Sequence, residues 1–169
     1  MPRCGASVGA VLHRTFRRTW ESPASAAVTW SYVADPAAVA ASSSHPTVAA
    51  IDGPLRVGST WDEYHLDDGC DFDSVRWRCV AFKPDRLITI EGLQSGALQR
   101  ATTTLHVHDD RVEVESTLRV SPALRAPGSP LDRALVPVLL ITPFGRRMLA
   151  EGFDESVEDD RRALAALAD

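Results

Sequence analysis

Residues 111–120 read RVEVESTLRV, in which small or apolar residues alternate with charged or polar ones. Successive side chains of a strand point to opposite faces, so this period of two predicts a strand with one solvated face and one core face. The core face would carry Val112, Val114, Ser116, Leu118 and Val120. A strand of this kind belongs to an antiparallel sheet, and another element must cover its apolar face.

The segment that follows this strand supplies the cover. From Leu131 to Leu167 the apolar period changes to 3.6, which predicts one long amphipathic C-terminal helix. Pro137 and Pro143 remove backbone donors, so the first half of the helix should kink or break. We expect the sheet to be covered by a stripe of Met148, Phe153, Val157 and Leu164.

The rest of the chain supplies further strands and two short helices. Strand patterns cover residues 11–20, 55–66, 72–82, 86–93 and 98–108. After the first of these, Ser22-Pro23 and Asp35-Pro36 each place an N-capping residue before a proline, which predicts two short helices. The predicted fold class is therefore α+β, with a curved antiparallel sheet wrapped around the C-terminal helix. We expect residues 1–10 to be a flexible N-terminus and residues 11–169 to be a single domain.

Composition and charge exclude several classes of protein. The chain has 169 residues, of which 44% are hydrophobic, enough for one core. A net charge of −5 argues against a nucleic-acid partner, and the lack of a run of 18 apolar residues argues against stable membrane insertion. The three cysteines, Cys4, Cys70 and Cys79, are unevenly spaced, and no signal-peptide pattern is present. We therefore expect a cytoplasmic protein without a disulfide or a metal site.

Four motifs occur in an order that resembles a known superfamily. They are SPASAAVTW at 22–30, Asp35-Pro36, Val57-Gly58-Ser59, and Val80 to Pro84 followed by Arg86-Leu87. In this order they resemble the START / polyketide cyclase / lipid-transport superfamily, also called SRPBCC, over residues 16–167. The turn at residues 109–112 departs from the family's pattern. The resemblance implies a helix-grip fold with a ligand cavity between sheet and helix, but no particular function, because such folds host many functions.

A pair of ionisable residues is the best candidate for chemistry. In the superfamily the third residue after the glycine of the third motif points into the cavity, and here that residue is Trp61. The strand period then predicts that Glu63 and His65 share its face. A carboxylate and an imidazole in a partly apolar cavity can transfer protons, so both are predicted to be catalytic. The alternative is a pair at the solvated rim, with Glu63 in a salt bridge.

Further residues are predicted to bind the substrate. They are Trp61 and Trp77 as packing surfaces, Arg100 as a charged group, Thr103 and Ser116 as small polar groups, and Leu139 and Phe144 as parts of an entrance lid. The lid is the apolar segment 135–144, and the entrance would lie between it and His45-Pro46. The sequence leaves open which of Arg14, Arg18, Glu91 and Arg100 face the cavity, since arginines at strand ends usually extend to solvent.

The functional expectation follows from the cavity and its lining. We expect the protein to bind a small hydrophobic molecule and to act on it as a cyclase or dehydratase of bacterial secondary metabolism, by acid–base chemistry without a cofactor. One alternative is a non-catalytic carrier or sensor of a lipid-like ligand, and another is an interaction protein with a filled cavity. Convergent ionisable groups in a cavity would favour the enzyme, and an uncharged cavity the carrier. A monomer and a homodimer are both compatible with the sequence.

Overall fold

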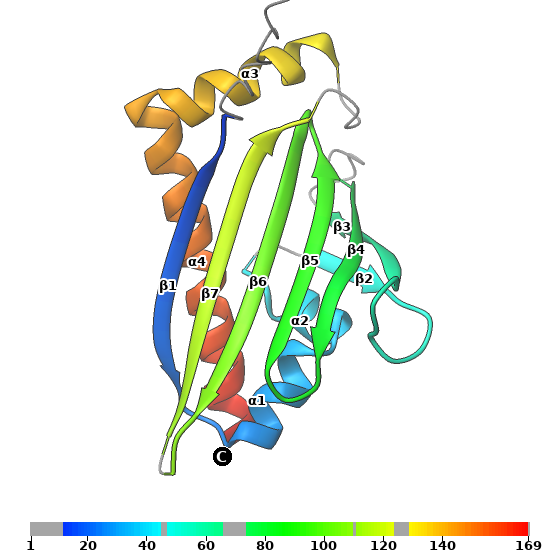
Figure 1. The fold of residues 1–169 in the computed structure, drawn as a ribbon, viewed down its shortest axis with the longest axis vertical. Helices are drawn as coiled ribbons and strands as arrows, with labels where there is room; N and C mark the ends of the chain where they lie inside the picture. Colours follow the sequence, from blue (N-terminus) through cyan, green and yellow to red (C-terminus); the bar gives the residue numbers. More distant parts are fainter. Residues whose placement is uncertain (1–11, 45–46, 66–73, 110, 124–128, 169) are drawn as a thin grey trace, which may run out of the picture.

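Seven antiparallel strands form one curved sheet, and the long last helix runs along one of its faces (Figure 1). The computed structural model describes residues 12–44, 47–65, 74–109, 111–123 and 129–168. The strands are β1 (Arg14–Ser22), β2 (Thr47–Ala50), β3 (Thr60–His65), β4 (Ser74–Lys83), β5 (Leu87–Gln94), β6 (Ala97–Val107) and β7 (Val112–Pro122), and the helices are α1 (Ala26–Val33), α2 (Pro36–Ser42), α3 (Pro130–Ile141) and α4 (Pro143–Ala168). The strand order is β1-β7-β6-β5-β4-β3-β2. The predicted α+β helix-grip fold is confirmed.

The strand β2 was not predicted from the sequence. It consists of Thr47-Val-Ala-Ala50 and pairs only with β3, at the edge of the sheet. Its two alanines have low strand propensity, and four residues are too few for a clear alternation of apolar and polar positions. The strand forms because it pairs with the edge of β3. This pairing is a tertiary contact, so the local sequence does not predict it.

The two short helices form where they were predicted, with one difference in capping. Asp35 caps α2 as expected, and its carboxylate accepts hydrogen bonds from the backbone N–H groups of Ala37 and Ala38. The cap of α1, however, is Ser25 and not Ser22. Ser22 is buried at the end of β1, where its hydroxyl shares a 2.7 Å hydrogen bond with that of Thr29. The hydroxyl of Ser22 therefore fixes the turn between β1 and α1.

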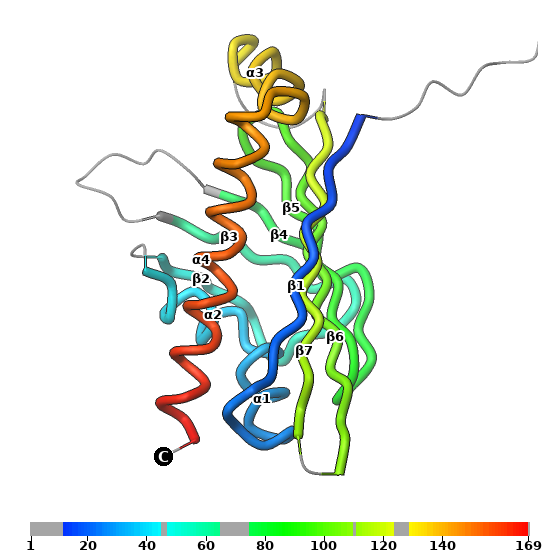
Figure 2. Tube along the Cα trace, turned by 90° about the vertical axis from the view of Figure 1, so that its left-hand side faces the viewer, coloured from blue at the N-terminus to red at the C-terminus, as the bar shows by residue number. Residues whose placement is uncertain are grey.

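The C-terminal segment breaks at Pro143, one of the two prolines at which a kink or break was predicted, and so forms two helices rather than one. Thr142, which precedes Pro143, is extended with ψ 145°, as expected for a residue before proline, and the helices meet there. Pro137 lies inside α3. At the junction a Cβ on Gly145 would lie 2.4 Å from the Cα of Leu139, so only glycine lets α4 approach α3 this closely. Figure 2 shows the result, with α3 lying across one end of α4 and of the sheet.

Apolar side chains of α4 attach it to the sheet near one edge. Phe153, Val157 and Leu164 are buried with Trp20 of β1 and with Val112 and Val114 of β7. These contacts confirm most of the predicted stripe. Met148 is the exception, because 44% of its surface is exposed. It lies near the start of α4, next to the junction with α3, and does not join the buried cluster.

A pair of substitutions tests this packing. Phe153→Ala should lower the free energy of unfolding by about 3–5 kcal/mol, because it removes a buried aromatic ring and leaves a cavity. Met148→Ala should cost less than about 1 kcal/mol, because most surface substitutions have small effects. Urea unfolding of both variants and the wild type measures the difference. Equal losses in the two variants would contradict the observed position of α4.

Candidate functional site

The side chains that face α4 belong to one face of the sheet, which we call the inner face. In an antiparallel pair, directly opposite residues point their side chains to the same face. Trp20, which contacts the helices, pairs with Val114, and Val114 pairs with Leu105, so the inward side chains of β1, β7 and β6 are identified. The assignment continues through Thr103 and Ile88 to β4 and β3. All the positions described below as inner follow from this register.

The two ends of the inner face are closed by helices. At one end, α1 and α4 bury Trp20, Leu105 and Val112. At the other end, α3 buries Ala97 and Val120 beneath Val136 and Leu140. The covering helices are therefore attached at the ends of the sheet, and α4 packs mainly against α3, β1, α1 and α2.

Between these ends the inner face remains partly accessible. Half-buried inner residues there are Ile90, Gln99, Ala101, Thr103 and Leu118. They lie on β5, β6 and β7, each of which is paired on both edges, so these edges are closed to solvent. The accessible parts of these side chains therefore lie on the inner face of the sheet, where Leu118 and Ile90 also pack against the buried clusters. We call these five residues the open inner face.

The predicted parity of β3 is confirmed for Trp61 and Glu63. Trp61 pairs directly with Trp77 of β4, and only 5% and 9% of their surfaces are exposed. Glu63 is half-buried on the same inner face, between Val75 of β4 and Ala49 of β2. His65 is the last residue of β3, and its side chain lies outside the described residues. Trp61, Glu63 and Trp77 thus lie together on the β3–β4 side of the inner face.

Both of these tryptophans bury an indole N–H that has no hydrogen-bond partner in the described part of the chain. Each unpaired buried donor costs about 1–3 kcal/mol. The ring of Trp77 also depends on Gly92, which lies opposite it on β5. A Cβ on Gly92 would be 2.6 Å from the Trp77 ring, so this glycine lets the indole lie flat against the sheet.

Two of the predicted polar residues lie on the inner face, and one does not. Thr103 and Ser116 pair with each other, Thr103 half-buried and Ser116 buried. The hydroxyl of Ser116 accepts a 3.2 Å hydrogen bond from the indole N–H of Trp20. Arg100 is exposed on the opposite face, where its Nε lies 3.0 Å from Oε1 of Glu91. The structure therefore does not bring Arg100 together with the other candidates.

The arginines of β1 lie at inner positions but contact the helices. Arg14 pairs with Val120 and Arg18 with Ser116 across β7. The Nε of Arg14 donates a 2.9 Å hydrogen bond to the carbonyl oxygen of Leu140, and the Nε of Arg18 lies 2.6 Å from Oδ1 of Asp154. Their hydrogen bonds attach the edge of the sheet to α3 and α4.

The predicted lid is split between a packed and an exposed residue. Leu139 is half-buried in α3, with its backbone against Gly145, whereas Phe144 is 75% exposed at the start of α4. His45 and Pro46, the other side of the predicted entrance, lie outside the described residues.

Two hollows of about 430 and 420 Å³ lie along residues 51–60, and the second is also lined by Trp30 and Phe82. Neither is lined by a residue predicted to bind or catalyse.

Two glutamines on the inner face were missed in the sequence analysis. Gln99 donates a 2.8 Å hydrogen bond from its amide nitrogen to the amide oxygen of Gln94, and both are half-buried. Gln99 has the same parity as Thr103 on β6, so the strand pattern contained the signal. The paired side-chain amides of Gln94 and Gln99 place neutral polar groups at the end of the open inner face that is nearer to α3.

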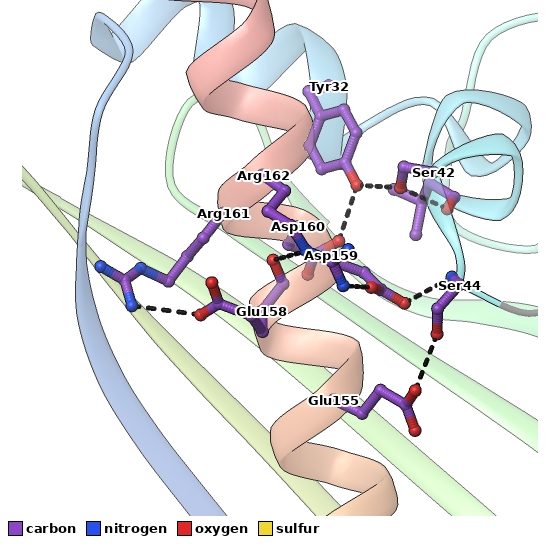
Figure 3. A network of polar contacts seen from close by, with 10 residues as sticks. Tyr32, Ser42, Ser44, Glu155, Glu158, Asp159, Asp160, Arg161 and Arg162 are labelled. Carbon is purple, nitrogen blue, oxygen red and sulfur yellow. Dashed lines mark hydrogen bonds and ion pairs between the residues drawn. The ribbon is translucent and has the colours of Figure 1, made fainter.

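A polar network fixes α4 to α1 and α2 (Figure 3). The hydroxyl of Tyr32 donates a 2.7 Å hydrogen bond to Oδ1 of Asp160 and shares one of 2.6 Å with Ser42. The backbone N–H of Ser44 donates a 2.7 Å hydrogen bond to Oδ2 of Asp159, which also binds Arg162. The network was also missed, although Asp160 lies three residues after Val157 and four before Leu164, both of the buried stripe.

The carboxyl group of Asp160 has a strongly raised pKa. Its pKa is raised to about 6, mainly by burial and also by the negative charge of Asp159, against the opposing effect of the hydrogen bond from Tyr32. The pKa of the Tyr32 hydroxyl is also raised, first by burial and then by the charge of Asp160. Both shifts arise from enclosing the network between α1, α2 and α4.

Cys79 is the one cysteine in the described ranges. No group of three or more histidine, cysteine, aspartate or glutamate residues there is placed to hold a metal ion. Cys79 is a free, buried thiol whose pKa is raised by burial, and Cys4 and Cys70 lie outside the described residues. No helix in those ranges combines the length and the apolar character needed to cross a bilayer.

A curved antiparallel sheet with a C-terminal helix standing along a partly open inner face defines the class of protein. Residues 13–168 match the family described as "Polyketide cyclase / dehydrase and lipid transport". The chain belongs to this family, and the resemblance inferred from its motifs is confirmed. No curated protein matches the sequence.

Solved structures with this fold include an aromatase/cyclase and a di-domain ARO/CYC protein. The Zhui aromatase/cyclase from Streptomyces sp. R1128 is 20% identical, with a TM-score of 0.62 over 92% of this chain and 93% of that one. The di-domain ARO/CYC BexL from the BE-7585A biosynthetic pathway is 13% identical, with a TM-score of 0.67 over 94% of this chain and 50% of that one. A protein from Arthrobacter aurescens is 14% identical, with a TM-score of 0.66 over 90% of this chain and 86% of that one. At these identities the likeness shows a shared fold.

The raised pKa of Asp160 makes stability depend on pH. Because the folded-state pKa of about 6 exceeds the usual 3.8, the stability that the protonated group contributes is complete below pH 3.8 and is lost as the pH rises through 6. Asp160→Asn keeps an acceptor oxygen for Tyr32 but cannot ionise. Relative to this variant, the wild type should lose about 3 kcal/mol of unfolding free energy between roughly pH 4 and pH 7.

Urea unfolding at a series of pH values measures this difference. Tyr32→Phe provides a second comparison, since loss of the donated hydrogen bond should raise the pKa of Asp160 further and enlarge the pH dependence. Parallel pH profiles for the wild type and Asp160→Asn would show that the carboxyl is not shifted as described.

Proposed function

We propose that the protein binds a small hydrophobic molecule against the open inner face and converts it by acid–base chemistry that needs no cofactor. The observation that carries this proposal is the partial exposure of Ile90, Ala101, Thr103 and Leu118 on strands that are paired along both edges. Apolar surface in such a position is stabilised when an apolar ligand displaces water from it. Membership of the polyketide cyclase / dehydrase and lipid transport family supports the same conclusion.

Glu63 and His65 are the proposed proton-transfer groups. Glu63 is half-buried between apolar neighbours on β2 and β4, and the strand alternation gives residue 65 the same parity. One group would remove a proton next to a carbonyl, and the other would protonate the departing oxygen as water is eliminated. Aromatase/cyclase proteins with this fold support the choice of a cyclisation or dehydration.

The two buried indoles favour an oxygen-containing substrate. The N–H groups of Trp61 and Trp77 have no acceptor in the described chain, and a carbonyl or phenol oxygen would supply one. Neither nitrogen has accessible surface, so a substrate oxygen would reach it only after the indole rotates. A pure hydrocarbon chain would leave both donors unpaired.

A carrier is the second candidate, and the composition of the open inner face favours it. Its five residues are uncharged, and both arginines at inner positions of β1 contact the helices, Arg14 through the carbonyl of Leu140 and Arg18 through Asp154. A lining of apolar and neutral polar groups is sufficient for binding without chemistry. In this case Glu63 and His65 would have no role in turnover.

Filling the open inner face tests ligand binding. The fluorescent probe 1-anilinonaphthalene-8-sulfonate serves as an apolar ligand, and Thr103→Trp should weaken its binding about tenfold because the added indole occupies the same space. Thr104→Trp is the matched control, since Thr104 is the next residue of β6 and has the opposite parity. Fluorescence titration measures both. Equal affinities in the two variants would contradict a site on the inner face.

Turnover separates the enzyme from the carrier. With a linear poly-β-ketone thioester as substrate and mass spectrometry of the products, Glu63→Gln and His65→Ala should each lower turnover roughly 100-fold while probe affinity is retained. Asp62→Asn is the control, because Asp62 has the opposite parity and binds Arg76 at 2.7 Å. Normal turnover in both variants would refute the assignment. Tight binding without any reaction by the wild type would support the carrier.

A further inference from the structure

An apolar stripe at the α3 end of the molecule has no role in the proposed site. Its residues, which are between 44% and 75% exposed, are Leu131, Leu135, Val138, Ile141, Phe144 and Met148. Spacings of three and four residues place the first four along one side of α3. The other side of α3 is already used, since Val136 and Leu140 are buried against the end of the sheet. We call the six residues the α3 stripe.

Because α3 lies at one end of the molecule, the α3 stripe forms part of the surface of that end. The helix lies across one end of the sheet, and α4 extends from it to the opposite end, where the chain terminates beside α1 (Figures 1 and 2). A flat surface could therefore meet α3 along its length without contacting α1 or α2. Exposed apolar groups on this scale commonly mark an interaction site.

The charges alongside the stripe identify the chemistry of the partner. Residues 130–151 contain Arg133, Arg146 and Arg147 against Asp132 and Glu151, a balance of +1 in a chain of net charge −5, and Glu151 lies 2.6 Å from Arg147 in an ion pair. The remainder of α4, residues 152–168, contains five acidic and two basic residues, a balance of −3. The molecule is thus cationic at the α3 stripe and anionic along the rest of α4. An anionic surface would attract the first region and repel the second.

We propose that the α3 stripe docks on the surface of an anionic phospholipid bilayer. Its apolar side chains would enter the boundary between headgroups and acyl chains, and its arginines would contact lipid phosphates, as in amphipathic helices that lie in the interface. A second copy of the chain fits less well, because a symmetric contact would place two cationic α3 ends together. The attachment is peripheral and leaves the sheet outside the bilayer.

Sedimentation with vesicles tests this proposal on the full chain. Vesicles of phosphatidylcholine with phosphatidylglycerol should bind the protein at least about tenfold more tightly than vesicles of phosphatidylcholine alone, and added salt should reduce the difference. The double variant Ile141→Ser, Phe144→Ser should weaken binding to the anionic vesicles by about tenfold or more. Leu167→Ser, which changes a residue 56% exposed at the far end of α4, should not.

A charge variant and two measurements complete the test. Arg133→Gln combined with Arg147→Gln should also weaken anionic binding, and thermal unfolding of each variant establishes that it is folded. Failure to bind anionic vesicles, or equal binding to neutral ones, would overturn the proposal. It would also be overturned if analytical ultracentrifugation showed a dimer that Ile141→Ser, Phe144→Ser converts to a monomer, since the stripe would then bind a second copy.

Discussion

The attachment of α4 along the β1 edge is the constraint on which the rest of the structure depends. Apolar packing of Phe153 and Val157 against Trp20 sets this position, and the ion pair between Arg18 and Asp154 ties the same edge. On the other side of the helix, the hydrogen bond between Tyr32 and Asp160 connects it to α1. A helix held in this way covers the ends of the inner face and leaves its middle accessible.

The division of α3 into two faces follows from the same arrangement. Val136 and Leu140 close one end of the sheet, so α3 cannot turn its remaining apolar residues inward. The carbonyl of Leu140 accepts a hydrogen bond from Arg14, which further fixes the rotation of the helix. The open inner face and the α3 stripe are therefore separate surfaces, and the two proposed interactions are independent of each other.

The sequence predicted the features that depend on local periodicity. The alternation of β7, the shared face of Trp61 and Glu63, and the start of α2 at Asp35-Pro36 could all be read from neighbouring residues. Features set by tertiary contacts could not be read in this way. The strand β2 depends on its pairing with β3, and the close approach of α4 to α3 depends on Gly145 against Leu139. The outer position of Arg100, in contrast, follows from its strand parity, which is opposite to that of Thr103, and the alternation already contained that signal. The perturbed carboxyl was also missed, because only the packed helices enclose Asp160.

The central claim is that a ligand binds between the sheet and α4. Nuclear magnetic resonance of ¹⁵N-labelled protein, titrated with 1-anilinonaphthalene-8-sulfonate, tests it residue by residue. The account predicts the largest shifts at the amides of Ile90, Ala101 and Thr103, which lie on adjacent strands of the open inner face. Shifts confined to the α3 stripe, with those three amides unchanged, would contradict it.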